Sequence, residues 1–531
     1  MERNTPIASF DAQKLIRSVA DFAEKVLDRC RDRYSSKETP LLVDGIDLET
    51  GEPVRWEGHV LSNPACQQNF LRTLDGLAAL TGEDRYRQRA EEWIGHALAV
   101  LRDPASGLLH WGGHTTYDLE EGQPLVGNHE LKCGYPYYRF LYQIDAEATR
   151  DFIAALWHKH IQDWSTLLFN RHGDYTQWDR SESWKREYQG GPLPIIENTM
   201  LSFINTGSDL IYAATLLFKL SGDEAPLLWA RRLLQRYDDV RNETTGLGGY
   251  QFNHRNPCRV HISFKEPLAG RDDVNETTVL TNSAIETRYG RTVLTWLNLY
   301  EELGDVHGRE FIDMASRDLT ALAEHSYDEE DGSFNPVLLD GTKLFPSNVL
   351  EDVGYCRPQK LVQVPADGLF FYVYARAYRL AGNEAFLDMA HKLADGMGWE
   401  FGKAERKGWT IDFSTVDRVS PPSLDGRANP NQNDACALLG LLELHRTTGR
   451  DLHLTSAASL GERLVRDYRR DAFFLTGAEA AEGYSNIDNA VPLALLYLAA
   501  ALEGRDVALP AFYANFTDFG PKVIIARRQR Q

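Results

Sequence analysis

The chain has 531 residues, of which 43% are hydrophobic and 25% are charged, as in an ordinary globular protein, so the composition excludes a largely disordered chain. Lys and Arg number 57 against 77 Asp and Glu, which gives a formal net charge of −20. Such a surface repels nucleic acid and anionic membranes, so we expect neither as a partner. An acidic substrate would need a local cationic pocket or a metal ion.

The first thirty residues predict an amphipathic helix, with Leu15, Val19, Phe22 and Val26 along one stripe. Charged side chains interrupt this segment throughout, which is not typical of a secretory leader. We therefore expect a cytoplasmic protein. The longest apolar run, 490–502, is too short to span a bilayer and predicts a buried helix, so no membrane span is expected.

Helical hairpins recur along the chain. In each, an apolar helix ends at a glycine, an acidic or polar residue follows, and a second, amphipathic helix begins. Glycine adopts the left-handed conformation that ends a helix, and the acidic residue faces the positive end of the next helix. A spacing of about 70 residues predicts six or seven hairpins, if one further hairpin lies between the first two of these glycines. The glycines are Gly82, Gly222, Gly304, Gly382 and Gly449.

The two helices of a hairpin differ in their apolar pattern. The first is apolar nearly all round, as in 369–375, whereas the second has one stripe that includes Phe386, Met389 and Leu393. Buried inner helices and one-faced outer helices describe a closed double ring. The sequence therefore predicts an all-α protein, an α/α toroid, with residues 1–531 as a single catalytic domain.

Long segments rich in Gly, Pro, Asn and aromatic residues separate the hairpins. Connections of this length are uncommon unless they carry function. In a toroid they gather at one mouth of the ring, so residues far apart in sequence can meet there. The segments are 104–136, 170–198, 245–290, 335–365 and 404–434.

The first two of these segments hold the residues that suggest chemistry. His110, His114 and Glu130 lie in the first, and Arg171 and His172 in the second. Two histidines and one glutamate suit a divalent cation that keeps open positions for water or substrate. We expect Glu130 to lie where a helix begins, so a role as a partner of the helix N-terminus is the structural alternative.

Three ordered phrases resemble the family 2 pectate lyases and their bacterial relatives. They are Trp111-Gly112-Gly113-His114, then His129-Glu130-Leu131-Lys132 with Tyr135-Pro136-Tyr137-Tyr138, and Asp163-Trp164-Ser165-Thr166 with Asn170-Arg171-His172-Gly173. The resemblance is concentrated between residues 105 and 200. Those lyases are α/α toroids that cleave polygalacturonate by β-elimination, with a manganese-like ion held by His, Glu and His and an arginine as the base.

Carried to this chain, the resemblance implies a site for a divalent metal ion. Its ligands would be Glu130, His172 and His114, with His110 as the competitor of His114. Mn²⁺ is the expected ion, and other transition metals or Ca²⁺ are alternatives. Arg171 would be the base.

β-Elimination gives this set a physical rationale. The proton at C5 of a uronate is acidic enough only if the charge of the adjacent carboxylate is neutralised, which a metal does as a Lewis acid. An arginine base is unusual, because guanidinium normally stays protonated. A nearby cation would be needed to favour its neutral form. Tyr175, Tyr250 and Tyr289 are the alternative bases.

The substrate, an acidic oligosaccharide, would need anion clamps and a surface for its sugar rings. Trp111 could stack on a sugar, since the apolar face of the ring fits an indole. The sequence leaves open which uronate is cleaved and the oligomeric state. The cationic candidates are Lys132, Lys265, Arg259, Arg288 and Arg291.

Two other enzyme classes share this architecture. A glycoside hydrolase acting on uronides needs paired carboxylates rather than a metal, for which Asp417, Asp434 and Asp488 are candidates. A sugar epimerase or isomerase would use histidine acid/base chemistry on free monosaccharides. A non-catalytic scaffold would leave the long mouth loops unexplained.

Overall fold

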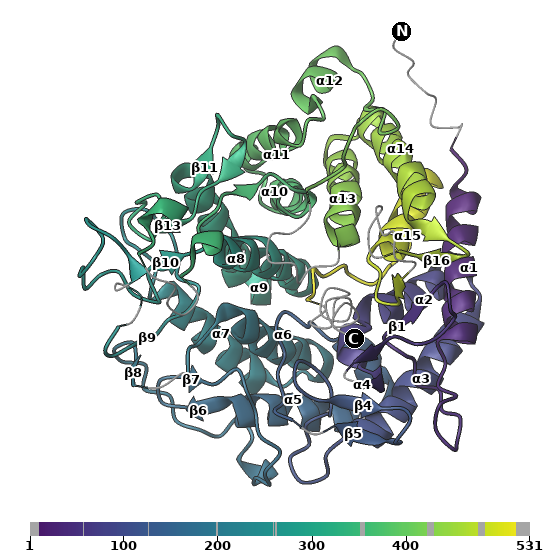
Figure 1. The fold of residues 1–531 in the computed structure, drawn as a ribbon, viewed down its shortest axis with the longest axis horizontal. Coiled ribbons are helices and arrows are strands. Elements are labelled where there is room, and N and C mark those ends of the chain that lie inside the picture. The colour runs from purple at the N-terminus through teal and green to yellow at the C-terminus, as the bar shows by residue number, and fades with distance from the viewer. Residues whose placement is uncertain are drawn as a thin grey trace.

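The computed structural model describes residues 10–56, 58–125, 127–197, 200–258, 260, 263–350, 356–421, 430–475 and 484–516. Its helices form two concentric layers around one axis (Figure 1). The inner layer consists of α2 (Gln68–Thr81), α4 (Tyr138–Ile144), α6 (Ile204–Ser221), the first part of α9 (Val293–His325), α10 (Gly368–Ala381), α13 (Pro430–Thr448) and α15 (Val491–Leu502). The outer layer consists of α1 (Ala12–Arg29), α3 (Asp84–Leu101), α5 (Ala146–His160), α7 (Glu224–Asp238), the second part of α9, α11 (Glu384–Gly396) and α14 (Asp451–Tyr468).

The two ends of the chain close the ring. The last inner helix, α15, packs against both α1 and α2, so the first and last elements are neighbours. Each inner helix is followed by an outer helix that runs back along it, except that the outer partner of α15 is α1. Among the described residues the ring therefore contains seven helix pairs, within the six or seven predicted, and the predicted α/α toroid is confirmed.

The burial of the helices follows their sequence pattern. Helix α10 is buried on all sides from Gly368 to Ala377, whereas α11 buries one stripe that includes Phe386, Met389 and Leu393. The five predicted turn glycines all have positive φ, between 65° and 75°. At Gly304 this conformation divides α9 into its inner and outer parts. The inner layer thus supplies the core, and the outer layer separates it from solvent.

Strands are short and belong to the connections between helices. The largest sheet is antiparallel with the order β2-β3-β4-β5, and Leu61 pairs with Asp118 across its centre. Further short helical pieces are α8 (Asn282–Ile285), the π-helical η5 (Glu286–Thr292), α12 (Phe401–Lys407) and the 3-10 helices η2 (Pro64–Cys66), η3 (Arg180–Glu182), η6 (Pro346–Asn348) and η7 (Pro358–Lys360). The strands are β1 (Gly45–Asp47), β2 (Arg55–Trp56), β3 (His59–Ser62), β4 (Thr116–Asp118), β5 (Gln123–Leu125), β6 (Ile161–Asp163), β7 (Leu168–Phe169), β8 (Ile195–Ile196), β9 (His254–Arg255), β10 (Val279–Leu280), β11 (Tyr327–Asp328), β12 (Ser333–Phe334), β13 (Val337–Leu338), β14 (Val364–Pro365), β15 (Arg469–Arg470), β16 (Phe473–Phe474) and β17 (Tyr484–Asn486).

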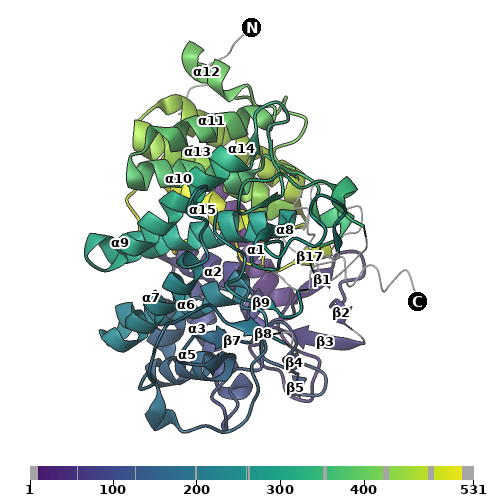
Figure 2. The ribbon, with the colours of Figure 1, turned by 90° about the vertical axis from the view of Figure 1, so that its left-hand side faces the viewer.

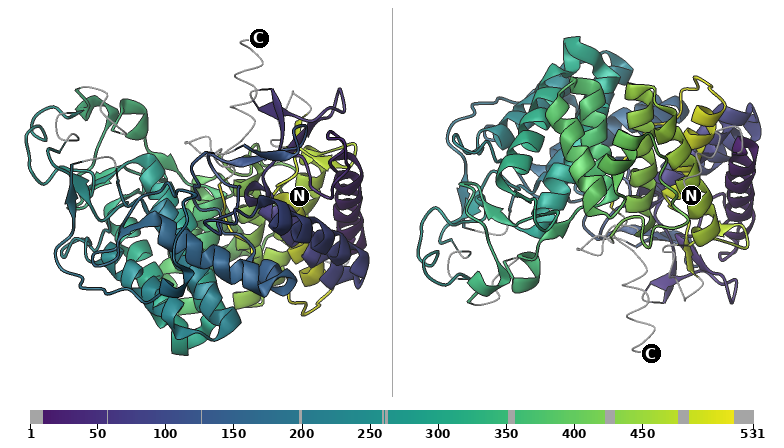
Figure 3. Two further views of the ribbon diagram at one scale, coloured as in Figure 1. Left: turned by 90° about the horizontal axis from the view of Figure 1, so that it is seen from below. Right: turned by 90° about the horizontal axis from the view of Figure 1, so that it is seen from above.

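The long connections lie at one end of the ring. In the side view, β1 to β5 and β17 lie on one side of the helical layers (Figure 2). The views from below and above show the same arrangement of helical body and loop-rich face (Figure 3). The inner helices begin at this loop end, and the glycine turns lie at the opposite, turn end. Residues of distant loops can therefore meet above the N-termini of the inner helices.

The segment after α15 enters the ring along its axis. Arg505 Nη1 donates to the carbonyl of Leu80 at the turn end, and Asn298 Nδ2 of α9 donates to the carbonyl of Phe512. Further on, the backbone N–H of Phe516 donates to the carbonyl of Cys133, in a connection of the loop end. We call residues 505–516 the axial segment. It lies inside the ring between the turn end and the loop end.

One expectation about local structure is wrong. Glu130 does not lie at the beginning of a helix, because α4 begins only at Tyr138 and Glu130 forms a β-bridge with Gly112. Its environment is therefore not a helix N-terminus. The assignment of residues 1–531 to one catalytic domain stays a prediction. None of the described helices combines the length and the apolar character needed to cross a membrane.

Buried carboxyl groups predict a pH-dependent stability. Burial raises the pKa of Asp434 to about 7. The hydrogen bond that Tyr468 donates to this carboxyl group opposes the shift but is the smaller effect. Because the folded-state pKa is raised, this group contributes stability at low pH that is lost as the pH rises from about 4 to about 7. Asp434→Asn should therefore flatten the fall in free energy of unfolding over this range by up to about 1.4 kcal/mol per pH unit.

The measurement is urea unfolding of both proteins at several pH values between 4 and 8. Asp388→Asn, on the exposed face of α11, is the matched control and should leave the slope unchanged. An unaltered slope for Asp434→Asn would show that Asp434 is ionised in the fold throughout this range.

Candidate metal centre

Glu130 is placed by a close approach of two backbones. Gly112 has φ of 106° and forms a parallel bridge with Glu130, and the N–H of Gly113 donates to the Glu130 carbonyl at 2.8 Å. A Cβ atom on Gly112 would lie 2.2 Å from that carbonyl oxygen. Only glycine therefore lets the loop that carries His114 lie directly against the segment that carries Glu130.

A second loop is joined to the same segment. The N–H groups of His129 and Gly173 each donate to the carbonyl of the other at 2.9 Å. Just before this bridge, the side chain of Asn170 accepts from the N–H of His172 at 3.0 Å, which turns the chain. Because of this bend, Arg171 and His172 direct their side chains to the same carboxylate, although they are adjacent in sequence.

Four side chains converge on the Glu130 carboxylate. His114 Nε2 lies 3.0 Å and Lys132 Nζ 2.8 Å from Oε2. His172 Nε2 lies 3.5 Å and Arg171 Nε 3.3 Å from Oε1. One ligand atom each from His114, Glu130 and His172 lies within 4.8 Å of the others. The three residues predicted as metal ligands are thus brought together.

The carboxylate is buried while the imidazoles reach outward. Glu130 is 0% exposed, whereas the side chains of His114 and His172 are 51% and 28% exposed. Within the described parts of the chain, neither carboxylate oxygen takes part in a hydrogen bond of good geometry, and His172 Nε2 is also without one. Burial lowers the pKa of His172, and Glu130 opposes this shift. A neutral imidazole is the form that binds metal ions.

These features fit a divalent cation. Two imidazole nitrogens and one carboxylate oxygen are the donor set of open sites for borderline transition metals. A buried carboxylate whose oxygens lack good hydrogen bonds requires another source of neutralisation. Mn²⁺ remains the proposed ion on this chemistry. His114, Glu130 and His172 are the residues that would hold it.

The competing histidine has a different environment. His110 stacks on Tyr175 with 4.4 Å between ring centroids, and its Nε2 lies 3.9 Å from Asp103. Burial lowers the pKa of His110, so it is a neutral residue of the loop packing. Of the two alternatives, His114 is the one that lies beside Glu130.

A pair of buried histidines supports the ligand loops from behind. His129 Nδ1 and His160 Nε2 are 3.0 Å apart, and His160 Nδ1 lies 2.9 Å from the carbonyl of Asn170. Burial lowers the pKa of His160 to about 4 and that of His129 well below its usual range. Both rings are therefore neutral, and they connect the segment before Glu130 to the bend before His172. The pairing of His129 with His160 was not predicted from the sequence, although His129 belongs to the motif His129-Glu130-Leu131-Lys132.

Of the predicted substrate-binding residues, only Lys132 lies at the cluster. Trp111 is 1% exposed and packs edge-on against Phe152, so it belongs to the core and cannot stack on a sugar. Arg288 is fully buried and paired with Asp318, which leaves it no access to a polymer. Lys265 is exposed, but its Nζ donates to the carbonyl of Ser347 in another loop.

The other cationic and tyrosine candidates are also accounted for. Arg291 is fully buried against Glu286, and Arg259 lies outside the described residues. The Tyr175 hydroxyl donates to the carbonyl of Leu109, and burial raises its pKa. Tyr289 is buried, and its hydroxyl donates to the carbonyl of Gly248. The ring of Tyr250 packs against Phe203 with 5.4 Å between the ring centroids.

Together, a helical ring and a His, Glu, His cluster beside an arginine form the arrangement expected from the sequence motifs. The model of the periplasmic pectate lyase family matches residues 39–519, so the chain belongs to this family. The resemblance found in the motifs is thereby confirmed. A pectate disaccharide-lyase of Dickeya dadantii (strain 3937) is 37% identical over 234 residues, which cover 40% of this chain and 42% of that protein. The aligned part is less than half of that relative.

Solved structures of two sugar-active enzymes are similar to the chain at low sequence identity. A sugar epimerase from a ruminal bacterium is 13% identical with a TM-score of 0.45, over 73% of this chain and 86% of that one. A variant of an α-1,6-mannanase from Salegentibacter sp. HEL1_6 is 12% identical with a TM-score of 0.43, over 93% and 99% of the two chains. Likenesses at this level do not assign an activity.

The family also corrects the expected location. A cytoplasmic protein was expected, but the family is described as periplasmic, so that expectation is wrong. The expectation of a cytoplasmic protein rested on the charged residues among the first thirty positions. These residues belong to an amphipathic helix, α1, which the structure contains. Such a pattern does not determine the compartment of a protein.

Because the ring of His160 lies directly against Gly173, we expect that no larger residue can replace this glycine without moving the ring. A Cβ on Gly173 would lie 2.8 Å from His160 Nε2 and 3.0 Å from Cδ2, so the ring would have to move. This would displace the bridge that carries His172. We expect Gly173→Ala to weaken divalent-metal binding by about 10- to 100-fold, as for other changes behind metal ligands. Titration calorimetry with Mn²⁺ measures the effect.

Gly95→Ala is the matched control, since a Cβ there meets only Ile144 at 3.7 Å and the residue lies within α3. It should bind Mn²⁺ as the native protein does. Native affinity in Gly173→Ala would mean that the loops adjust without the histidine pair.

Proposed function

We propose that the chain is a polysaccharide lyase that cleaves uronate glycans, with polygalacturonate or oligogalacturonate as substrate, by metal-assisted β-elimination. The observation that carries the proposal is the convergence of Arg171 on the buried carboxylate of Glu130 beside two histidines. Membership of the pectate lyase family supports the class. The name of the Dickeya relative, pectate disaccharide-lyase, supports a uronate substrate.

The site must make a weak carbon acid reactive. A divalent ion, when bound, supplies Lewis-acid neutralisation of the uronate carboxylate next to C5. Glu130 and the two histidines hold that charge at the bottom of the loop mouth. Lys132 has a side chain only 12% exposed and keeps its ammonium group at the same carboxylate. It would orient the carboxylate of the substrate as a fixed cation.

Arg171 is the group placed to move the proton. Its side chain is 40% exposed, so one edge reaches the open mouth while Nε faces Glu130. As the base it removes the proton from C5, and the electron pair forms the double bond between C4 and C5. The glycosidic oxygen leaves C4 and takes a proton from water. The products are one fragment with a new reducing end and a second fragment with an unsaturated uronate at its new non-reducing end.

A hydrolase mechanism would need two carboxylates across a sugar, and two of the three candidate aspartates have structural partners. Asp434 accepts a hydrogen bond from Tyr468. Asp488 accepts from the N–H groups of Asn69 and Phe70 at the beginning of α2, where the backbone donors need a partner. Both are framework residues of the ring.

The first test of the proposal is dependence on a metal ion. Chelation with EDTA should abolish the rise in absorbance near 235 nm on polygalacturonate, and Mn²⁺ should restore it. Glu130→Gln should lose both the activity and the increase in melting temperature that Mn²⁺ gives the native protein, since a ligand stabilises only the state that binds it. Glu120→Gln, an exposed carboxylate paired with Arg55, is the matched control.

Full activity in EDTA, together with no effect of Mn²⁺ on the melting temperature, would exclude the metal-assisted mechanism. Release of reducing ends without absorbance near 235 nm would instead indicate hydrolysis.

The second test separates the base from a carboxylate clamp. Arg171→Lys keeps a positive charge but loses the planar fork. If Arg171 is the base, kcat should fall by about 10²- to 10⁴-fold while Mn²⁺ binding is unchanged. Arg180→Lys, in the following loop and paired with Asp151, controls for the substitution itself.

The opposite result would assign the chemistry elsewhere. Near-native kcat in Arg171→Lys with a severe loss in Tyr175→Phe would make Tyr175 the base and Arg171 a clamp.

A further inference from the structure

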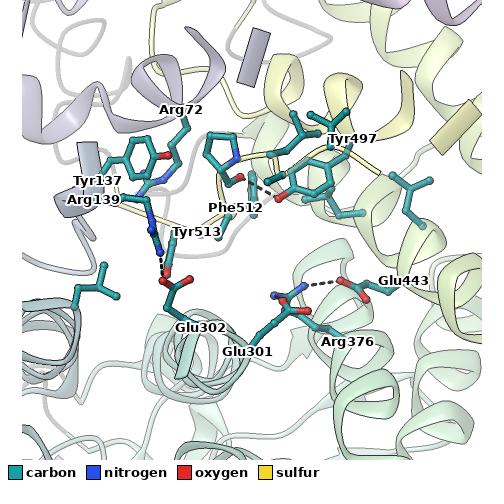
Figure 4. A pocket seen from close by; sticks show the side chains of 18 of the residues that line it. Arg72, Tyr137, Arg139, Glu301, Glu302, Arg376, Glu443, Tyr497, Phe512 and Tyr513 are labelled. Carbon is teal, nitrogen blue, oxygen red and sulfur yellow. Dashed lines mark hydrogen bonds and ion pairs between the residues drawn. The ribbon is translucent and has the colours of Figure 1, made fainter. Parts of the chain in front are cut away.

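A second cavity lies on the turn side of the axial segment. It has a volume of about 570 Å³ and is lined by residues of every inner helix, including Arg72 of α2, Tyr212 of α6 and Tyr497 of α15 (Figure 4). None of the residues of the metal cluster lines it. Its rim lies near the C-terminal ends of the inner helices, at the turn end, where Leu220, Glu302 and Arg446 line it. Phe512 and Tyr513 of the axial segment line its inner part.

Aromatic rings and one buried guanidinium form the inner wall. Arg72 is 0% exposed, and its guanidinium carbon lies 5.2 Å from the ring centre of Tyr137 and 4.9 Å from that of Tyr513. Its Nη2 donates to the carbonyl of Tyr135 at 2.6 Å, but its buried Nε has no hydrogen-bond partner. Arg72 makes no ion pair within the described parts of the chain. It is therefore a desolvated cation with an unused donor.

The opposite wall has arginine and glutamate held together. Arg376 Nη1 lies 2.6 Å from Glu443 Oε1, and Arg376 also pairs with Glu301, while its buried Nε is likewise without a partner. Arg379 pairs with the same two glutamates. This arrangement fixes donors and acceptors in position and leaves carboxylate edges at the cavity, as hydroxyl groups of a sugar require.

The rim adds further positive charge. Lys219 and Arg446 are exposed lining residues without an ion pair among the residues that the structure describes, although Arg446 acts on Glu301 and lowers its pKa. The lining contains five cationic side chains (Arg72, Arg139, Lys219, Arg376 and Arg446) and four carboxylates (Glu301, Glu302, Glu443 and Asp506), so one positive charge is in excess. Part of the cationic charge compensates the negative ends of the inner helices, which lie here. This compensation limits the remaining field, so the cavity suits one or two carboxylates rather than a polyanion.

From these features we propose that the cavity binds a short acidic saccharide of one or two uronate units. Tyrosine rings pack on the apolar faces of the sugar, Arg72 and Arg376 bind its carboxylates, and Glu301 and Glu443 accept from its hydroxyl groups. The volume lies in the range of small-molecule sites. This site is separate from the proposed catalytic centre, and only the choice of galacturonate as the probe rests on the proposed function.

The experiment measures binding of digalacturonate by titration calorimetry in the full-length Glu130→Gln/His172→Ala variant, in which the loop site is disabled. We expect saturable binding that weakens with added salt, since exposed charges are screened. Maltose, a neutral disaccharide, should not bind. Ala511→Trp in this background, which fills the cavity from the axial segment, should weaken binding by at least about tenfold, equivalent to about 1.4 kcal/mol.

Two further variants test the charge. Arg446→Glu at the rim should weaken binding several-fold, whereas Arg309→Glu on the exposed outer part of α9 should not. These results also cover the case in which Ala511→Trp does not fold. Absence of digalacturonate binding, equal binding of maltose, or equal effects of Arg446→Glu and Arg309→Glu would each overturn the proposal.

The outcome is independent of the catalytic proposal. Arg446→Glu in the otherwise native protein should keep the initial rate of polygalacturonate cleavage, because Arg446 is at the other end of the ring. If no cleavage near 235 nm occurs in the native protein, the proposed function fails, while digalacturonate binding that is lost on filling the cavity still supports the second site.

Discussion

The burial of one carboxylate organises the loop end of this molecule. A charged group that is 0% exposed is costly unless cations or hydrogen bonds compensate it, and Glu130 has two imidazoles, a lysine and an arginine around it. Each of these groups comes from a connection that the backbone bridges at Gly112 and Gly173 hold in place. The cluster therefore depends on the close approach of three segments as much as on the side chains themselves.

The direction of the inner helices bears on how a protein of net charge −20 could bind the acidic substrate proposed for it. Every inner helix begins at the loop end, so the positive ends of the helix dipoles point toward the proposed site. Lys132 and Arg171 add localised charge there. At the turn end the dipoles have the opposite sign, and Arg376, Arg379 and Glu443 form a compensated network.

The sequence was informative where a local rule decides the structure. Left-handed glycines end the inner helices, and one-sided stripes distinguish outer helices from inner ones, so the toroid could be predicted from the recurring glycine turns and from the contrast between α10 and α11. The ordered motifs predicted that His114, Glu130 and His172 lie together. The roles of Trp111 and Arg288 could not, because a residue in a loop-rich segment is buried or exposed according to packing with distant elements, such as Phe152 and Asp318. The same holds for the axial segment, whose partners Asn298 and Cys133 are remote in sequence.

The position of Arg171 bears on how an arginine could serve as a base. In the structure its Nε lies 3.3 Å from Glu130 Oε1, so the group proposed as the base is in direct contact with the carboxylate proposed as a metal ligand. A divalent ion held by Glu130 would compete with the guanidinium for this carboxylate, since both are cations. Under the proposed function, the position of Arg171 would therefore be coupled to metal binding through Glu130.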